Sequence, residues 1–89
     1  MKAVITVTGK DCVGIIAGVS ALCSENNANI IDITQSVLSE YFAMIMLVEI
    51  DKASLGFDEL RESLDRVGET TNTKIHIMHE DIFNSMHKI

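Results

Sequence analysis

The residues with the clearest potential for chemistry lie in one short stretch between a β-branched run and an apolar helical pattern. They are Gly9, Lys10, Asp11, Cys12, Val13, Gly14 and Ile15. Glycines permit a tight turn and let a ligand approach the backbone closely. The start of a helix adds unpaired N–H groups and a positive dipole end, which attract anions. The stretch is therefore either a ligand-binding loop or a turn, capped by Asp11, that binds nothing.

Two cysteines are the candidates for thiol chemistry. Cys12 lies near the start of a helix, where thiolates are favoured, which would suit a nucleophile or a redox sensor. No histidine or second cysteine adjoins it, and a small loop residue explains it equally well. Cys23 falls at an apolar helical spacing and is expected in the core.

Histidines and glycine motifs give no sign of a metal or a cofactor. His76 and His79 are separated by an odd number of positions, so on a strand they point to opposite faces. No further cysteine or paired carboxylate completes a zinc shell. The glycine spacing matches neither the Rossmann nor the P-loop fingerprint. We therefore expect no catalytic residues, no metal and no cofactor.

Composition excludes several classes of partner. The net charge is −6, and the seven Lys and Arg residues are scattered, which argues against direct nucleic-acid binding. No apolar stretch reaches the roughly 18–20 residues of a membrane helix. Because Met1-Lys2 leads straight into a strand pattern, we expect no signal peptide. We expect reduced thiols and a cytoplasmic protein. With 89 residues, the chain reads as a single domain, 1–89, with a thin core.

Hydrophobic periodicity predicts the elements and their order. Strand patterns cover residues 2–8, 30–38, 41–50 and 73–79; helical patterns lie within residues 11–27, from Phe57 to Val67 with Gly68 as a C-terminal cap, and within residues 80–89. The order β-α-β-β-α-β predicts an α+β, ferredoxin-like fold. Its four-stranded antiparallel sheet would carry both main helices on one face, and a short C-terminal helix would follow.

The hairpin register predicts which face of the sheet is core. If Ser39-Glu40 is a two-residue turn, Leu38 faces Tyr41 and the pairing continues outward. One face then carries Ile31, Ile33, Val37, Phe42, Met44, Met46 and Val48, with Gln35 as the polar exception. The other face, which includes Ile30, Asp32, Ala43, Ile45 and Leu47, is too apolar to be fully wet. We expect a second copy of the chain to cover that face or a sheet edge.

The motif Gly9-x-Asp11-x-x-Gly14-Ile15, followed by an apolar helix and Asn29-Ile30-Ile31-Asp32-Ile33, resembles the ACT domain over nearly the whole chain. The similarity is to small stand-alone bacterial ACT proteins and to the ACT halves of glycine-cleavage transcriptional repressors. Such domains bind amino acids or related metabolites and pair side by side. The resemblance places the ligand between Gly9–Ile15 of one subunit and Asn29, Ile30 and Ile31 of its partner. Relatives often have Arg where this chain has Cys12.

These observations predict a non-catalytic regulatory module. It would bind a small metabolite, plausibly an amino acid, at a homodimer interface and signal to a partner protein. The alternative is a ligand-free protein–protein interaction module. An acylphosphatase-type enzyme shares the topology, but the first loop has no Arg and residues 36–41 contain no Asn.

Overall fold

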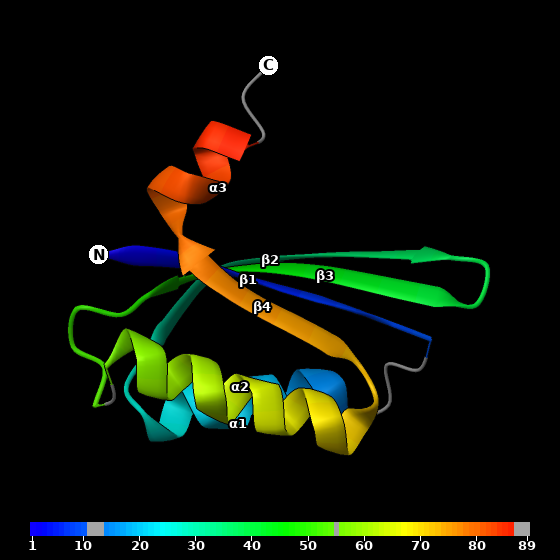
Figure 1. Cartoon of the computed structure of the whole chain (residues 1–89), viewed down its shortest axis with the longest axis horizontal. Helices are drawn as coiled ribbons and strands as arrows, with labels where there is room; N and C mark the ends of the chain where they lie inside the picture. Colours follow the sequence, from blue (N-terminus) through cyan, green and yellow to red (C-terminus); the bar gives the residue numbers. More distant parts are fainter. Residues whose placement is uncertain (11–13, 55, 87–89) are drawn as a thin grey trace.

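Alternating strands and helices build a twisted sheet with helices below it (Figure 1). The structure, a computed structural model, describes residues 1–10, 14–54 and 56–86. Its elements are β1 (Lys2–Gly9), α1 (Ile15–Glu25), β2 (Asn29–Leu38), β3 (Tyr41–Glu49), α2 (Phe57–Thr71), β4 (Lys74–His79) and α3 (Glu80–Met86). The predicted ferredoxin-like order is therefore confirmed.

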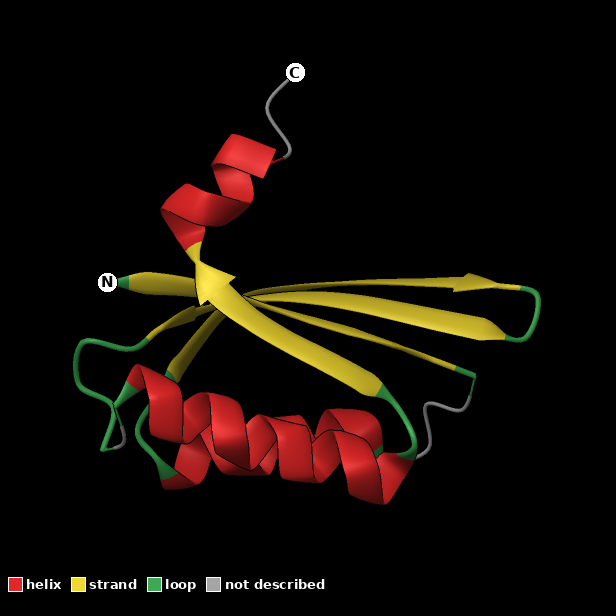
Figure 2. Ribbon diagram, in the orientation of Figure 1, coloured by secondary structure: helices red, strands yellow, loops and turns green. Residues whose placement is uncertain are grey.

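The sheet has the order β2-β3-β1-β4, and every pair of neighbouring strands is antiparallel. Strands β2 and β4 are the edges. Helices α1 and α2 lie side by side under one face, whereas α3 rises from the other (Figure 2). Helix α1 contacts β2 and helix α2 contacts β4, so α1 covers the β2 half of this face and α2 covers the β4 half.

The core lies between the sheet and the two long helices. Its fully buried members include Ile5, Val7, Ile15, Val19, Cys23, Met44, Met46, Val48, Leu60 and Leu64. On α1 the buried positions are Ile15, Val19 and Cys23, which repeat every four residues and form one stripe. Cys23 is thus the core residue that its spacing predicts, whereas Ile16 is exposed.

The hairpin follows the predicted register from its turn as far as Asp32, which pairs with Leu47. The ladder then shifts, because Ile30 pairs with Val48 and Ile31 is an extra residue. The predicted faces are therefore wrong at this end of β2. Ile31, expected in the core, is 44% exposed, and Ile30, expected on the outer face, packs against the core.

A second correction concerns the tip of the hairpin. Val37 has the strand parity of the core face and pairs with buried Phe42, yet it is 69% exposed. Figure 1 shows the reason: β2 and β3 run well beyond the ends of the helices below them. Strand alternation gives the face of a residue but not whether a helix reaches it.

The helix ends also differ from expectation. The N-cap of α1 is Gly14, not Asp11. Gly14 has φ +79°, and no described side chain makes a capping hydrogen bond at this end of the helix. Helix α2 continues past Gly68 to Thr71, and Asn72 ends it in the left-handed conformation. Gly68 is buried within the helix, where its lack of a side chain is needed for packing. No helix in the described ranges is long and apolar enough to cross a membrane.

Helix α3 accounts for the burial of Val4, which the two main helices do not cover. Val4 is only 3% exposed but is not part of the core cluster. Its partners, Leu47 and Met78, have the parity of the outer face. Helix α3 contacts β1 and β4 and stands on this face of the sheet (Figure 1). A second, smaller buried site therefore lies above the sheet.

Truncation of Val4 tests this covered site. We expect Val4→Ala to lower the free energy of unfolding by about 2–3 kcal/mol, because it removes buried methyl groups and leaves a cavity. Ile45→Ala is the matched control on the same face. It removes more atoms, but Ile45 is 43% exposed, so it should cost about 1 kcal/mol. Urea unfolding measures both. Equal costs, or a larger cost at Ile45, would contradict the assignment.

The burial of Cys23 makes a chemical prediction. Burial raises the pKa of its thiol, so the reactive thiolate is scarce at neutral pH. In a Cys12→Ser variant we expect Cys23 to react with a thiol reagent such as DTNB at least about 100-fold more slowly in the native state than in urea. A native rate close to the unfolded rate would show that this side chain is accessible.

Candidate functional site

The loop expected to bind a ligand begins where β1 ends. Gly9 ends the strand, Lys10 follows it, and Gly14 is the N-cap of α1. Asp11, Cys12 and Val13 lie outside the described residues. Gly14 adopts φ +79°, which L-residues with a side chain rarely adopt, and a Cβ built on it would have no neighbour within 4 Å. Ile15 is the first residue of α1, and its side chain is fully buried in the core.

The second half of the expected site lies at the opposite end of the sheet. Asn29 and Lys2 both pair with Glu49, whereas Gly9 pairs with Phe42 at the other end of β3. One chain therefore does not bring Asn29, Ile30 and Ile31 near the Gly9–Gly14 end. Only a second copy can bring such residues to this loop.

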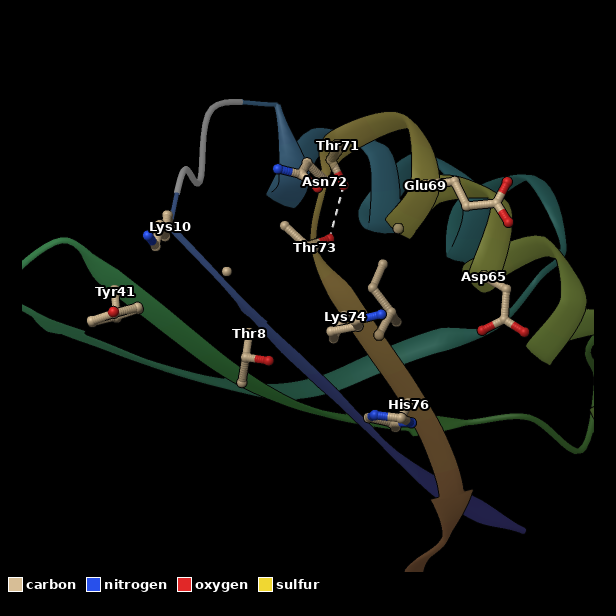
Figure 3. A pocket seen from close by; sticks show the side chains of 13 residues that line it. Thr8, Lys10, Tyr41, Asp65, Glu69, Thr71, Asn72, Thr73, Lys74 and His76 are labelled. Carbon is tan, nitrogen blue, oxygen red and sulfur yellow. Dashed lines mark hydrogen bonds between the residues drawn. The ribbon is translucent and has the colours of Figure 1, made fainter.

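An open groove of about 930 Å³ adjoins the described part of the loop (Figure 3). Strands β1 and β4, the end of α2 and the turn after it line the groove, and Lys10 and Tyr41 lie at one rim. The lining residues are Thr8, Gly9, Lys10, Tyr41, Asp65, Gly68, Glu69, Thr71, Asn72, Thr73, Lys74, Ile75 and His76.

The groove is floored by a tight contact around Thr73. A Cβ on Gly9 would lie 2.7 Å from Thr73 Cγ2, and a Cβ on Gly68 would lie 2.9 Å from the Thr73 carbonyl oxygen. The Thr73 N–H donates to the Gly68 carbonyl over 2.9 Å. The hydroxyls of Thr71 and Thr73 share a 2.8 Å hydrogen bond. Glycine at both positions lets β1, the end of α2 and the start of β4 meet this closely at the floor of the groove.

Charge is divided across the groove. Lys74 projects from β4 beside Thr8 of β1, its cross-strand neighbour, and His76 lies further along the same face. The ammonium of Lys10 lies 5.7 Å from the ring centroid of Tyr41, within range of a cation–π interaction. Asp65 and Glu69 of α2 form the acidic wall. The arrangement suits small polar ligands.

A second polar cluster lies at the other end of the sheet. The Met1 amine donates to Glu49 Oε1 over 2.8 Å and also contacts the Asp51 carboxylate. Hydrogen bonds to Asp51 and Glu49 raise the pKa of this amine, and the bond from the amine lowers the pKa of Glu49. These groups pair with one another and are open to water, so the cluster ties the start of β1 to the end of β3 and the turn after it.

The two histidines occupy opposite faces, as their spacing predicts. His76 is exposed on the outer face, whereas the ring of His79 stacks on Phe57 of α2, with centroids 4.7 Å apart. Within the described residues, no three His, Cys, Asp or Glu side chains are grouped to hold a metal ion.

Sequence reasoning missed most of the groove. Tyr41 comes from the start of β3, and Asn72 and Lys74 come from the segment that joins the end of α2 to the start of β4; none stands in a motif with Gly9 and Lys10. The available signal was Gly68, which was read as a helix cap. A glycine inside an amphipathic helix also marks a close approach by another segment, and here that segment is the start of β4.

Comparison with known proteins identifies the family. The model of the ACT domain matches residues 2–78. A UPF0237 protein of Listeria innocua is 48% identical over 89 residues, which is the whole of both chains. An ACT domain protein from Streptococcus pneumoniae has a solved structure with a TM-score of 0.81 and 47% identity, covering 98% of both chains.

A more distant structure shows the same fold. A putative glycine cleavage system transcriptional repressor aligns with a TM-score of 0.72 and 23% identity, over 86% of this chain and 44% of its own. The motif around Gly9 and Gly14, the element order and these matches agree over nearly the entire sequence. The chain belongs to the ACT-domain family.

Proposed function

We propose that this protein is a regulatory module that works as a homodimer and binds a small metabolite, plausibly an amino acid, at the subunit seam. The observation that carries the proposal is the Gly9–Gly14 end of the chain, where a left-handed glycine opens an apolar helix without a side-chain cap. Such a helix start leaves N–H groups for an anionic ligand. A ligand carboxylate would bind there.

The two sheet edges differ in a way that favours β2 as the seam. Strand β4 has six residues, carries Lys74 and two histidines, and leads directly into α3. Strand β2 has ten residues, and Asp32 is its only charged one. Long edge strands without charges are open to pairing with another chain, whereas short and charged edges resist it. The β2 edge is therefore the better site for a second copy.

Apolar surface continues from this edge onto α1. The helix contacts β2 and has no charged residue between Ile15 and Ser24. Ile16 on α1 and Ile31 and Val37 on β2 are exposed although they are large and apolar. A partner that pairs with β2 would cover this surface, which adds hydrophobic burial to the backbone hydrogen bonds.

A twofold axis beside β2 would also complete the predicted ligand site. Two β2 strands related by such an axis, when it runs perpendicular to the sheet, are antiparallel, so the Asn29 end of one lies beside the Leu38 end of the other. Leu38 pairs with Tyr41, and Gly9 pairs with Phe42, so Leu38 marks the loop end of the sheet. Asn29, Ile30 and Ile31 of the partner would then reach the end of the sheet that holds Gly9, Lys10 and Gly14.

The proposed mechanism is a shift of population. A ligand held between two subunits binds the dimer and not the monomer, so it stabilises the dimer by its differential affinity. The partner protein would recognise the dimer through a surface that stays free, such as the outer face with Tyr41 and Ile45 exposed. In the ligand-free alternative, the same surfaces bind proteins without this coupling.

A thermal-shift screen against the twenty amino acids tests ligand binding. We expect at least one to raise Tm by several degrees at millimolar concentration. Gly14→Asn should abolish the shift, because asparagine tolerates the left-handed backbone but its side chain obstructs the helix start. Gly56→Asn is the matched control at the N-cap of α2, where asparagine is favoured, and should keep the shift.

A screen without any shift would refute the amino-acid proposal. A shift that survives in Gly14→Asn would place the ligand elsewhere on the molecule.

Charged substitutions distinguish an edge seam from a face seam. We expect Val37→Lys to convert the dimer to a monomer in light scattering at micromolar concentration, since it buries charge at the β2 edge. Ile45→Lys introduces the same charge at another exposed apolar strand residue, on the outer face, and should leave the dimer intact. The reverse pattern would mean that the sheets pair by their faces, and a monomeric native protein would refute the dimer.

A further inference from the structure

We propose that the groove on β1 and β4 contains a binding site for a small oxyanion, either a carboxylate or a phosphate group. Its donors are Thr8, Lys74 and His76, with Lys10 at the rim (Figure 3). The site is formed by one chain and lies at the β4 edge, away from the proposed seam at β2. It therefore depends neither on the dimer nor on the ligand proposed above.

The donors share one small area of the outer face. Thr8 pairs with Lys74, and Thr6 pairs with His76, so the hydroxyl, the ammonium and the imidazole come from neighbouring positions on two adjacent strands. Same-face neighbours across a strand pair have Cβ atoms about 5–8 Å apart. One oxyanion can bridge side chains at that separation, because each of its oxygens accepts a charge-assisted hydrogen bond from a different donor.

The basic side chains of the groove, which are Lys10, Lys74 and His76, form no ion pair with a carboxylate among the described residues. Among the described residues, neither Lys74 nor His76 takes part in an ion pair, whereas Arg61 pairs with Asp58 over 3.2 Å. Lys10 contacts only the ring of Tyr41 in the described part of the chain. In a chain of net charge −6, Lys10 and Lys74 thus meet around one groove without a carboxylate partner among the described residues, and His76 adds an imidazole beside them.

The groove is also shaped to select small anions. Its floor is set by the close contacts of Gly9 and Gly68 with Thr73, which fix the backbone positions from which Thr8 and Lys74 project. Asp65 and Glu69 line the opposite wall and would repel a polyanion that spans the groove. A single carboxylate or phosphate group on the strand side avoids them, and a ligand that also carries an ammonium could meet them favourably.

Two-dimensional NMR of the full chain tests the site. Inorganic phosphate and acetate are titrated separately, with sodium chloride added to hold ionic strength constant. We expect saturable shifts at the amides of Thr8, Lys74 and His76 with at least one anion. Lys74→Gln should weaken binding at least about tenfold, through loss of a charge-assisted hydrogen bond. Lys52→Gln is the matched control, because it removes a charge from the exposed turn after β3, at the end of β3 opposite the one that pairs with Gly9. This variant should bind the anion normally.

The two anions identify the source of the ligand group. A response to phosphate alone indicates a phosphorylated compound, and a response to acetate indicates a carboxylate. The proposal is overturned if neither anion shifts the groove amides more than the rest of the protein, or if the two lysine variants titrate alike. A Lys74→Gln spectrum that otherwise overlays the native one excludes unfolding as the cause. These readouts do not involve the dimer or the Tm screen.

Discussion

The burial of β1 along its inner face, and at Val4 on its outer face, is the constraint on which the rest of the fold depends. Below the sheet, Ala3, Ile5 and Val7 pack into the core under α1 and α2, and above it Val4 is covered from the side of α3. The strand is also hydrogen-bonded on both edges, by β3 and β4. Its last residue, Gly9, has no side chain, so β4 can begin against it. The end of β1 and the start of β4 therefore hold the floor of the groove and the start of the loop.

Covering this strand leaves other surfaces uncovered, and these are the surfaces to which we assign function. The helices under the sheet are shorter than the hairpin, so Val37 is exposed at its tip. None of the described strands pairs with the outer edge of β2, and this edge has few charges to discourage pairing. A chain of 89 residues cannot bury every face of a four-stranded sheet. Association with a second copy is the simplest way to bury the remainder.

Local patterns predicted the fold well where each residue's environment is set by its near neighbours. The Ser39-Glu40 turn fixed the hairpin register from Leu38 to Asp32, and four-residue spacing marked Cys23 as core. The errors arose where contacts between segments far apart in the sequence decide the environment of a residue. The bulge at Ile31 is an adjustment between two whole strands, and helix length relative to the hairpin decides the exposure of Val37. Neither the bulge nor this exposure can be predicted from the alternation of apolar and polar residues along a strand.

The candidate site shows the same division. A glycine-bounded stretch at a helix start was recognisable from Gly9 and Gly14, and the structure places both beside open space or a groove. Lys74 and Tyr41 were not recognisable, because only the sheet order brings them near Lys10. The motif includes Ile15 in the loop, and the four-residue spacing on α1 places its side chain in the core.

Isotope-filtered NOE spectroscopy on a mixture of labelled and unlabelled chains tests the central claim most directly, because it records only contacts between subunits. We predict cross-peaks from Ile31 of one subunit to Val37 of the other, as antiparallel pairing of two β2 strands requires. Cross-peaks confined to the outer face, such as those of Ile45, would contradict this account, and so would an absence of any contact between subunits.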